Sequence, residues 1–172
     1  MTVRDIYDHI NAFAPFDQIW LKDNVGLLVG GSLHPVSAVM TALDITPGVV
    51  RQAREAGCEL IVSHHPVIYY PIKGLAVDDP VYLLAQSGIA AICAHTNADF
   101  ASGGINDCLA DLLGLGGVEP LYPADGSLPS RVGGLREPMR AEKFCEFVKA
   151  KTGCGVLRYA RADNAERVER VA

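Results

Sequence analysis

The sequence predicts an α/β fold in which a mostly parallel sheet carries helices on both faces. Three short apolar runs, which end at Asp44, Ser63 and His95, alternate with segments whose apolar residues repeat at helical spacing. Strands of a parallel sheet are buried on both faces and read as continuous apolar runs, whereas the helices between them read as amphipathic. The alternation of the two patterns therefore indicates a parallel sheet covered on both sides.

The expected elements follow in order along the first two thirds of the chain. Thr2 can cap the first helix and Pro15 stops it, while Thr46-Pro47 and Asp79-Pro80 open later helices. Gly57 and Gly88 end these two helices. The predicted strands are Gly26 to Val29, Ser37 to Asp44, Glu59 to Ser63 and Ile89 to His95, and a further helix covers Gly103 to Leu113.

The last third has a different composition. Leu115 to Pro129 is rich in Gly and Pro and is typical of a linker. We expect a strand at 131–135, a helix at 139–152, a strand near 155–159 and the beginning of a strand in the final "ERVERVA". Residues 1–115 would then form an N-terminal α/β lobe. Residues 116–172 would form a linker and the incomplete start of an inserted or C-terminal lobe.

Charge and cysteine content exclude several classes of protein. The chain has 15 basic and 20 acidic residues, a net charge of −5, and no run of Lys or Arg. Binding to nucleic acid or to a membrane surface needs a basic patch, so neither is expected. The 5 cysteines include no C-x-x-C pair and favour reduced thiols. With no signal peptide and no apolar run of about 20 residues, we expect a cytoplasmic protein.

Histidines gather where two of the predicted strands end. His64 and His65 follow one strand, His95 ends the next, and Asp99 lies in the predicted loop after it. Ligands of open parallel sheets bind outside the carboxyl ends of the strands, so these side chains should face one crevice. Imidazole and carboxylate together suit Zn, Fe, Mn, Co or Ni. A single histidine more often serves as a hydrogen-bonded core or surface residue, and we interpret His9 and His34 in that way.

The adjacency of His64 and His65 favours two ions over one. Successive side chains of a strand point to opposite sides, so neighbouring histidines in extended backbone can hold one ion each. Pro66 biases His65 toward that extended conformation. Asp99 can join the pair, and Asp44 at the same sheet edge can support it. This is the plan of a two-metal hydrolytic site.

Other segments carry weaker signals. "DNVGLLVGG" at 23–31 can line a pocket, but it suits a tight turn into a strand equally well. "SGGIND" at 102–107 opens a helix whose amides can hold a phosphate, although it matches no phosphate-binding motif. Cys93 is buried by pattern and is a poor nucleophile candidate.

At these residues the sequence resembles the NIF3-like dinuclear metal-centre proteins, also called GTP cyclohydrolase 1 type 2 homologs. The matching stretches cover essentially the whole chain and are "DNVGLLVG", "ALDIT", "IVSHHP" and "AHTNADFASGGINDCLADLLGL". The resemblance implies His64, His65 and Asp99 as metal ligands, with His95 lining the same site. If the protein is an enzyme, we expect His95 to be catalytic, either as a proton carrier or by orienting a ligand. The resemblance also implies a ring-shaped homohexamer whose metal pairs face an internal cavity.

The resemblance further implies that family members continue past this point. A later strand and the second half of the domain supply another His and a Glu that complete the metal pair. We therefore expect the 172 residues to be part of a longer protein. The implied activity is a metal-dependent hydrolysis of a nucleotide or a similar phosphate- or ring-bearing metabolite. The alternative is a metal-binding oligomeric scaffold or partner-binding protein without catalysis.

Overall fold

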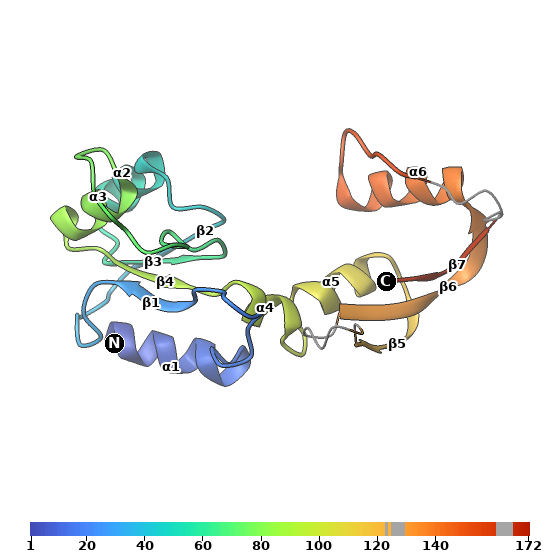
Figure 1. Ribbon diagram of the computed structural model, residues 1–172, viewed down its shortest axis with the longest axis horizontal. Coiled ribbons are helices and arrows are strands. Elements are labelled where there is room, and N and C mark those ends of the chain that lie inside the picture. The colour runs from blue at the N-terminus through green and yellow to red at the C-terminus, as the bar shows by residue number, and fades with distance from the viewer. Residues whose placement is uncertain (123, 125–129, 161–166) are drawn as a thin grey trace. The chain divides into compact units, whose positions relative to one another are not determined.

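The computed structural model describes residues 1–122, 124, 130–160 and 167–172. These residues form two compact units, Met1–Ser102 and Gly103–Ala172, and we describe each by itself (Figure 1). The division at Leu115 that the sequence suggests stays a prediction.

The first unit contains a mixed sheet with the strand order β1-β4-β3-β2. Its strands are β1 (Gly26–Val29), β2 (Val39–Ala42), β3 (Leu60–Ser63) and β4 (Ala90–Cys93). β3 pairs in parallel with both β2 and β4, whereas β1 runs antiparallel to β4. The predicted mostly parallel α/β fold is confirmed, and the antiparallel β1 forms one edge of it.

Helices cover both faces of this sheet, as the apolar pattern predicts. Successive residues of β3 point to opposite faces. Leu60 packs in one cluster with Val3 of α1 (Val3–Phe13), whereas Ile61 packs in a second cluster. That second cluster includes residues of α2 (Pro47–Glu55) and α3 (Pro80–Ser87), among them Leu84. β3 is therefore one of the two inner strands of this sheet, and it is also the strand that leads into His64.

The predicted helix boundaries of this unit rest on local capping. The Thr2 side chain accepts a hydrogen bond from the backbone of Asp5, and the Asp5 side chain accepts one from the backbone of Thr2. Thr46 and Asp79 cap helices that begin at Pro47 and Pro80. Gly88 ends α3 in the left-handed conformation, with a φ of 66°.

Two expectations for the first unit need correction. The segment 37–44 is not a buried strand, because β2 is shorter and lies at the sheet edge, where alternate residues such as Val39 are exposed. The residues after His95 do not form a loop, because Thr96–Phe100 form the short helix α4. Asn97 is buried in α4, and its side chain donates to the carbonyl of Ala14. This long-range contact, which no local pattern signals, fixes the helix.

The second unit contains an antiparallel sheet with the strand order β5-β6-β7. Its elements are α5 (Ile105–Leu112), β5 (Gly116–Leu121), β6 (Ser130–Arg140), α6 (Ala141–Thr152) and β7 (Arg167–Val171). The Arg131 guanidinium on β6 pairs with the carboxylate of Asp107 on α5. Its hydrogen bond lowers the pKa of Asp107. This ion pair joins the helix to the sheet.

Two expectations for the second unit were wrong. The predicted linker 115–129 contains β5, which tolerates Pro120 because it is an edge strand. The remaining linker positions 123 and 125–129 lie outside the described residues. The segment 155–159 is not a strand. The strand expected in "ERVERVA" is present as β7, where it pairs with β6.

Glu59 holds the beginning of β2 against β3. Its carboxylate accepts hydrogen bonds from the backbone amides of Ser37 and Ala38 and from the Ser37 hydroxyl, at 2.8 to 3.0 Å. These bonds, led by those from the Ala38 and Ser37 amides, lower the pKa of Glu59 from an ordinary 4.5 to about 2. The clamp sets the register of the strand that leads to the paired histidines.

Replacing Glu59 by Gln should remove a pH-dependent part of the stability. A lowered folded-state pKa means that the stabilisation is complete above pH 4.5 and is lost as the pH falls toward about 2. Urea unfolding at several pH values should show a wild-type advantage that shrinks across this window. Glu55→Gln, at an exposed position in α2, is the matched control. An advantage that does not change between these pH values would contradict the assignment.

Within the described residues, no helix has both the length and the apolar character needed to cross a membrane. All 5 cysteines are free thiols.

Candidate metal centre

The backbone hydrogen bonds between β3 and its neighbours continue beyond the end of the strand and hold the backbone of the paired histidines in place. The amide of His64 donates to the carbonyl of Ala42 at 3.1 Å, and the amide of His65 donates to that of Leu43 at 2.9 Å. On the other side, the amide of Ala94 donates to the carbonyl of Ser63 at 2.9 Å. The chain therefore leaves β4 at His95, beside the point where it leaves β3 at the paired histidines. The expected crevice at the carboxyl ends of parallel strands is where the three rings meet.

The three imidazoles form one cluster. One ring nitrogen from each of His64, His65 and His95 lies within 4.8 Å of the other two. The ring centroids are 5.2 Å apart for His64 and His65, and 5.0 and 5.7 Å from these two rings to His95. Of the residues that the structure describes, no other group of three His, Cys, Asp or Glu side chains is arranged in this way.

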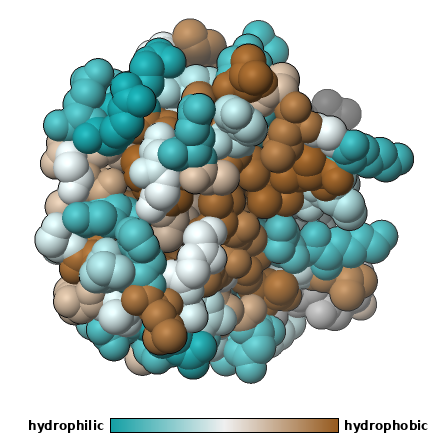
Figure 2. All heavy atoms as spheres, turned by 90° about the vertical axis from the view of Figure 1, so that its left-hand side faces the viewer, coloured by the Kyte–Doolittle hydropathy of each residue, from teal (hydrophilic) through white to brown (hydrophobic). Residues whose placement is uncertain are grey.

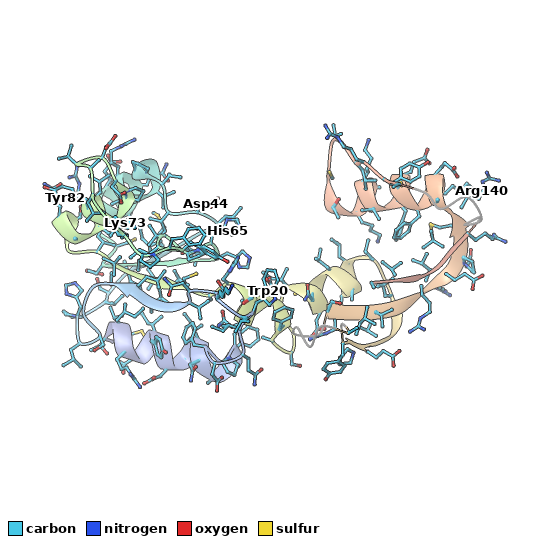
Figure 3. All side chains as sticks on the ribbon, viewed as in Figure 1. Trp20, Asp44, His65, Lys73, Tyr82 and Arg140 are labelled. Atoms are coloured by element: carbon cyan, nitrogen blue, oxygen red, sulfur yellow. The ribbon has the colours of Figure 1, made fainter. Side chains whose placement is uncertain are left out.

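Each imidazole has a partner at its Nδ1 atom. The carbonyl of Ala94 lies 3.1 Å from Nδ1 of His64, Asp44 lies 2.7 Å from that of His65, and Asp23 lies 2.9 Å from that of His95. A carbonyl or carboxylate can only accept, so in the neutral ring the proton belongs on Nδ1. The lone pair then lies on Nε2, which is the arrangement that a histidine ligand needs. Figure 3 shows Asp44 and His65 at the same end of the sheet.

Asp99 lies in the first turn of α4 and faces His64. Its Oδ1 is 3.7 Å from Nε2 of His64, and the two side chains are 25% and 22% exposed. This separation is too long for a hydrogen bond. It is short enough for a single ion to contact both atoms at the usual distances of about 2.0–2.2 Å. The structure thus brings together the three predicted histidines and places Asp99 beside one of them, His64. Imidazole and carboxylate donors are those that divalent ions such as Zn prefer.

Asp23 is the residue of this site that the sequence did not single out. Its side chain is 2% exposed and accepts from Nδ1 of His95 and from the backbone and hydroxyl of Thr96. Burial acts to raise the pKa of Asp23, but the hydrogen bonds from Thr96, His95 and the Asn24 amide outweigh it and lower the pKa. The carboxylate therefore stays charged beneath His95. The segment "DNVGLLVG" contains it, but only as a possible pocket lining or turn.

Comparison with known proteins places this chain in a family. The family model described as Duf34/NIF3 (NGG1p interacting factor 3) matches residues 1–172. The chain belongs to the Duf34/NIF3 family. A relative named GTP cyclohydrolase 1 type 2 homolog from Clostridium perfringens is 32% identical over 179 residues, which cover 100% of this chain and 68% of the relative. A relative of the same name from Halalkalibacterium halodurans is 40% identical over 105 residues, 59% of this chain and 28% of its own length.

Solved structures of NIF3-related proteins share the fold. A hypothetical protein of Staphylococcus aureus is 25% identical with a TM-score of 0.86, and the match covers 99% of this chain and 70% of that one. A Bacillus cereus protein related to NIF3 is 21% identical with a TM-score of 0.85, over 99% of this chain and 75% of that one. This member of the family thus spans about two thirds to three quarters of these neighbours.

The remaining candidates in this NIF3-family chain make contacts within the protein, and their binding roles stay predictions. The Asn24 side chain donates to the carbonyl of Ile68 at 2.6 Å and so holds the segment after the paired histidines. The amide of Gly103 donates to Asp107 at 2.7 Å, and α5 belongs to the second unit. Burial raises the pKa of the Cys93 thiol to about 12, which confirms that it is a poor nucleophile.

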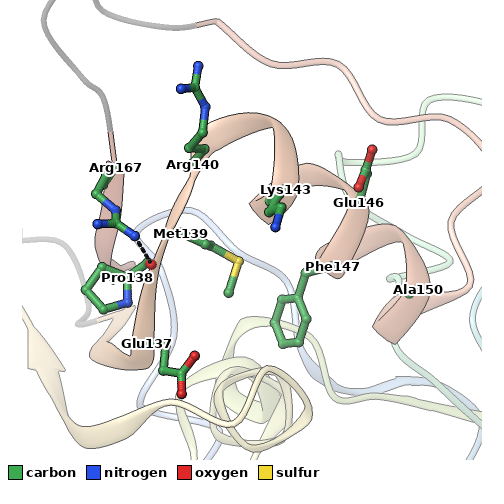
Figure 4. Close-up of a pocket in the computed structure, with 9 residues that line it drawn as sticks. All are labelled: Glu137, Pro138, Met139, Arg140, Lys143, Glu146, Phe147, Ala150 and Arg167. Carbon is green, nitrogen blue, oxygen red and sulfur yellow. Dashed lines mark hydrogen bonds between the residues drawn. The ribbon is translucent and has the colours of Figure 1, made fainter.

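A separate pocket lies in the second unit, between β6 and α6 (Figure 4). Its volume is about 700 Å³, and Met139 and Phe147 supply its apolar lining. Its charged residues are of both signs and sit on exposed positions; they are Glu137, Arg140, Lys143, Glu146 and Arg167. Arg167 already donates to the carbonyl of Pro138 at 3.1 Å. Because the charged residues are of both signs and exposed to solvent, this pocket has no electrostatic preference for an anionic or a cationic ligand.

Proposed function

We propose that this chain is a dinuclear divalent-metal hydrolase of the NIF3 family. His64, His65 and Asp99 would hold Zn, Fe, Mn, Co or Ni, and His95 would serve as the catalytic proton carrier. The observation that carries the proposal is the hydrogen bonding of all three imidazoles at Nδ1. With an acceptor at each Nδ1, Nε2 is the atom that each of the three rings has left for an ion.

Each residue has a distinct task in this proposal. A bound divalent ion supplies Lewis acidity and makes water a better nucleophile at neutral pH. His64 and His65 present one donor nitrogen each, and their spacing is set by the backbone bonds of β3. Asp99 adds negative charge beside His64. His95 contacts the buried carboxylate of Asp23 through Nδ1. This negative charge would stabilise the imidazole ring when the ring takes up a proton from the reacting water.

The substrate class proposed is a nucleotide or a similar phosphate- or ring-bearing metabolite. Its support is the name of the relatives, GTP cyclohydrolase 1 type 2 homolog, which belongs to those proteins. The matched regions cover 28% and 68% of the two relatives.

A second candidate is a metal-binding oligomeric scaffold, and the surface of the first unit favours it. The segment between β3 and α3 exposes large apolar side chains, including Tyr70 at 76% and Val77 at 76%. Figure 2 views the molecule from the end where Figure 3 shows Lys73 and Tyr82, and apolar side chains gather on that face. Exposed apolar surface of this kind favours association. Copies of the same chain, as in a homohexamer, are the partners we propose.

Metal content and turnover measured together separate the two candidates. The chain is purified without added metal, its ions are counted by elemental mass spectrometry, and hydrolysis of GTP and other nucleotides is assayed for wild type and His64→Ala. If the ion is catalytic, the variant loses turnover and keeps its assembly. Loss of assembly or stability without any wild-type turnover would favour the scaffold. A wild-type chain that carries no metal as purified and takes none up when divalent metal is then added would refute both.

A further inference from the structure

We propose that Asp23 is a positioning residue that locks His95 in the Nδ1–H tautomer. With Nδ1 protonated, the Nε2 lone pair of His95 stays free to accept a proton. The use of this lone pair rests on the proposed metal site, whereas the lock itself is a property of the metal-free chain.

The groups that surround the carboxylate of Asp23 are hydrogen-bond donors, so the carboxylate acts only as an acceptor. It accepts from the Asn24 amide at 2.8 Å, the Thr96 hydroxyl at 2.5 Å and the Thr96 amide at 3.3 Å. Both of its oxygens also lie within 3.0 Å of Nδ1 of His95. A charged carboxylate has no proton to donate, so Nδ1 of His95 must be the donor in this contact. With the Nδ1 position occupied, the neutral ring keeps Nε2 free of a proton.

The three histidines of the cluster are not supported equally. His64 has a neutral carbonyl as its partner, and His65 has Asp44, whose side chain is 57% exposed. His95 alone has a buried carboxylate, because the side chain of Asp23 is 2% exposed. Water and salt screen the exposed pair and do not reach the buried one. The tautomer of His95 should therefore be the most firmly fixed of the three.

The local backbone is shaped to deliver Asp23 to this place. The amide of Asp23 donates to the carbonyl of Trp20 at 2.9 Å, which closes a tight turn. Within the turn Lys22 has a φ of 76°, a backbone conformation that residues other than glycine rarely adopt. The amide of Trp20 donates to the Thr96 hydroxyl at 3.1 Å, so the same threonine holds both ends of the turn. Strained backbone that the surroundings maintain is typical of functional sites.

Imidazole ¹⁵N NMR of the full chain, without metal and at a pH where the rings are neutral, tests the lock. We expect the wild-type His95 ring to be protonated at Nδ1 and unprotonated at Nε2. In Asp23→Asn an amide NH₂ must face one of the groups that now donate to the carboxylate. We therefore expect the Nε2–H tautomer to appear for His95, while that of His65 is unchanged. Asp44→Asn should reverse the pattern, and Asp17→Asn, at an exposed position, should leave both rings unchanged.

A wild-type His95 ring with its proton on Nε2, or with interchanging tautomers, would overturn the inference. So would an Asp23→Asn ring that keeps the Nδ1 proton. If Asp23→Asn does not fold, the wild-type spectrum decides alone.

Zinc titration of the same proteins keeps the two proposals apart. Because His95 is proposed as a proton carrier and not as a ligand, Asp23→Asn should bind Zn²⁺ with an affinity close to that of the wild type. The expected tautomers together with no Zn²⁺ binding in the wild type would uphold the lock and refute the metal site. Zn²⁺ binding together with a freely exchanging His95 would do the opposite.

Discussion

Replacing His65 by alanine should lower the affinity of the chain for divalent metal by more than about 100-fold. Loss of a support that only orients a ligand already costs about 10- to 100-fold, and loss of the ligand itself should cost more. His65 is also part of the one cluster of three such side chains in the described part of the chain. Competition between the protein and a coloured Zn²⁺ chelator measures the change.

His9→Ala is the matched control for this prediction. His9 lies at an exposed position in α1, so its removal makes the same chemical change away from the cluster. The control should bind as the wild type does. Equal weakening in both variants, or in neither, would show that the three-imidazole cluster does not bind the ion.

Replacing Ile61 by alanine should lower the free energy of unfolding of the first unit by about 3 kcal/mol. Large-to-small substitutions of this kind cost about 2–5 kcal/mol because a cavity remains. Ile61 is 0% exposed and packs in the cluster that contains Leu84, Ala91 and Val50. Urea unfolding followed by the fluorescence of Trp20 reports on this unit, because Trp20 is the single tryptophan of the chain.

The control for the core prediction is Leu21→Ala. Leu21 is 83% exposed, so its truncation should change the stability by less than about 0.5 kcal/mol. The folded Ile61→Ala protein should still bind metal, since its substitution leaves the backbone bonds of His64 and His65 in place. A loss in Ile61→Ala no larger than that in Leu21→Ala would show that β3 is not an inner strand of the core.

Local chemistry explains what could be predicted from the sequence. Thr2, Thr46-Pro47 and Asp79-Pro80 act within a single turn of helix, so their effect does not depend on the rest of the fold. The gathering of His64, His65, His95 and Asp99 needed only one further step. Parallel strands place their carboxyl ends at one edge, and residues at the ends of neighbouring strands must then meet there.

Long-range contacts explain what could not be predicted. Asp23 reaches His95 from a turn 72 residues earlier in the chain, and nothing in its own segment indicates that partner. The helix α4 depends on Asn97, whose side chain contacts the carbonyl of Ala14. β5 forms because its backbone pairs with that of β6, although the Gly and Pro content of β5 is typical of a linker. In each case the deciding partner is distant in sequence.

Anomalous diffraction from crystals of this chain grown with Zn²⁺ tests the central claim most directly. The account predicts a zinc peak within about 2.0–2.1 Å of Nε2 of His64 or His65, with Asp99 close to the ion. Each Nδ1 atom should keep the partner that it has in the metal-free chain. A peak only at other side chains, or three histidines whose Nε2 atoms contact no ion at saturating Zn²⁺, would contradict it.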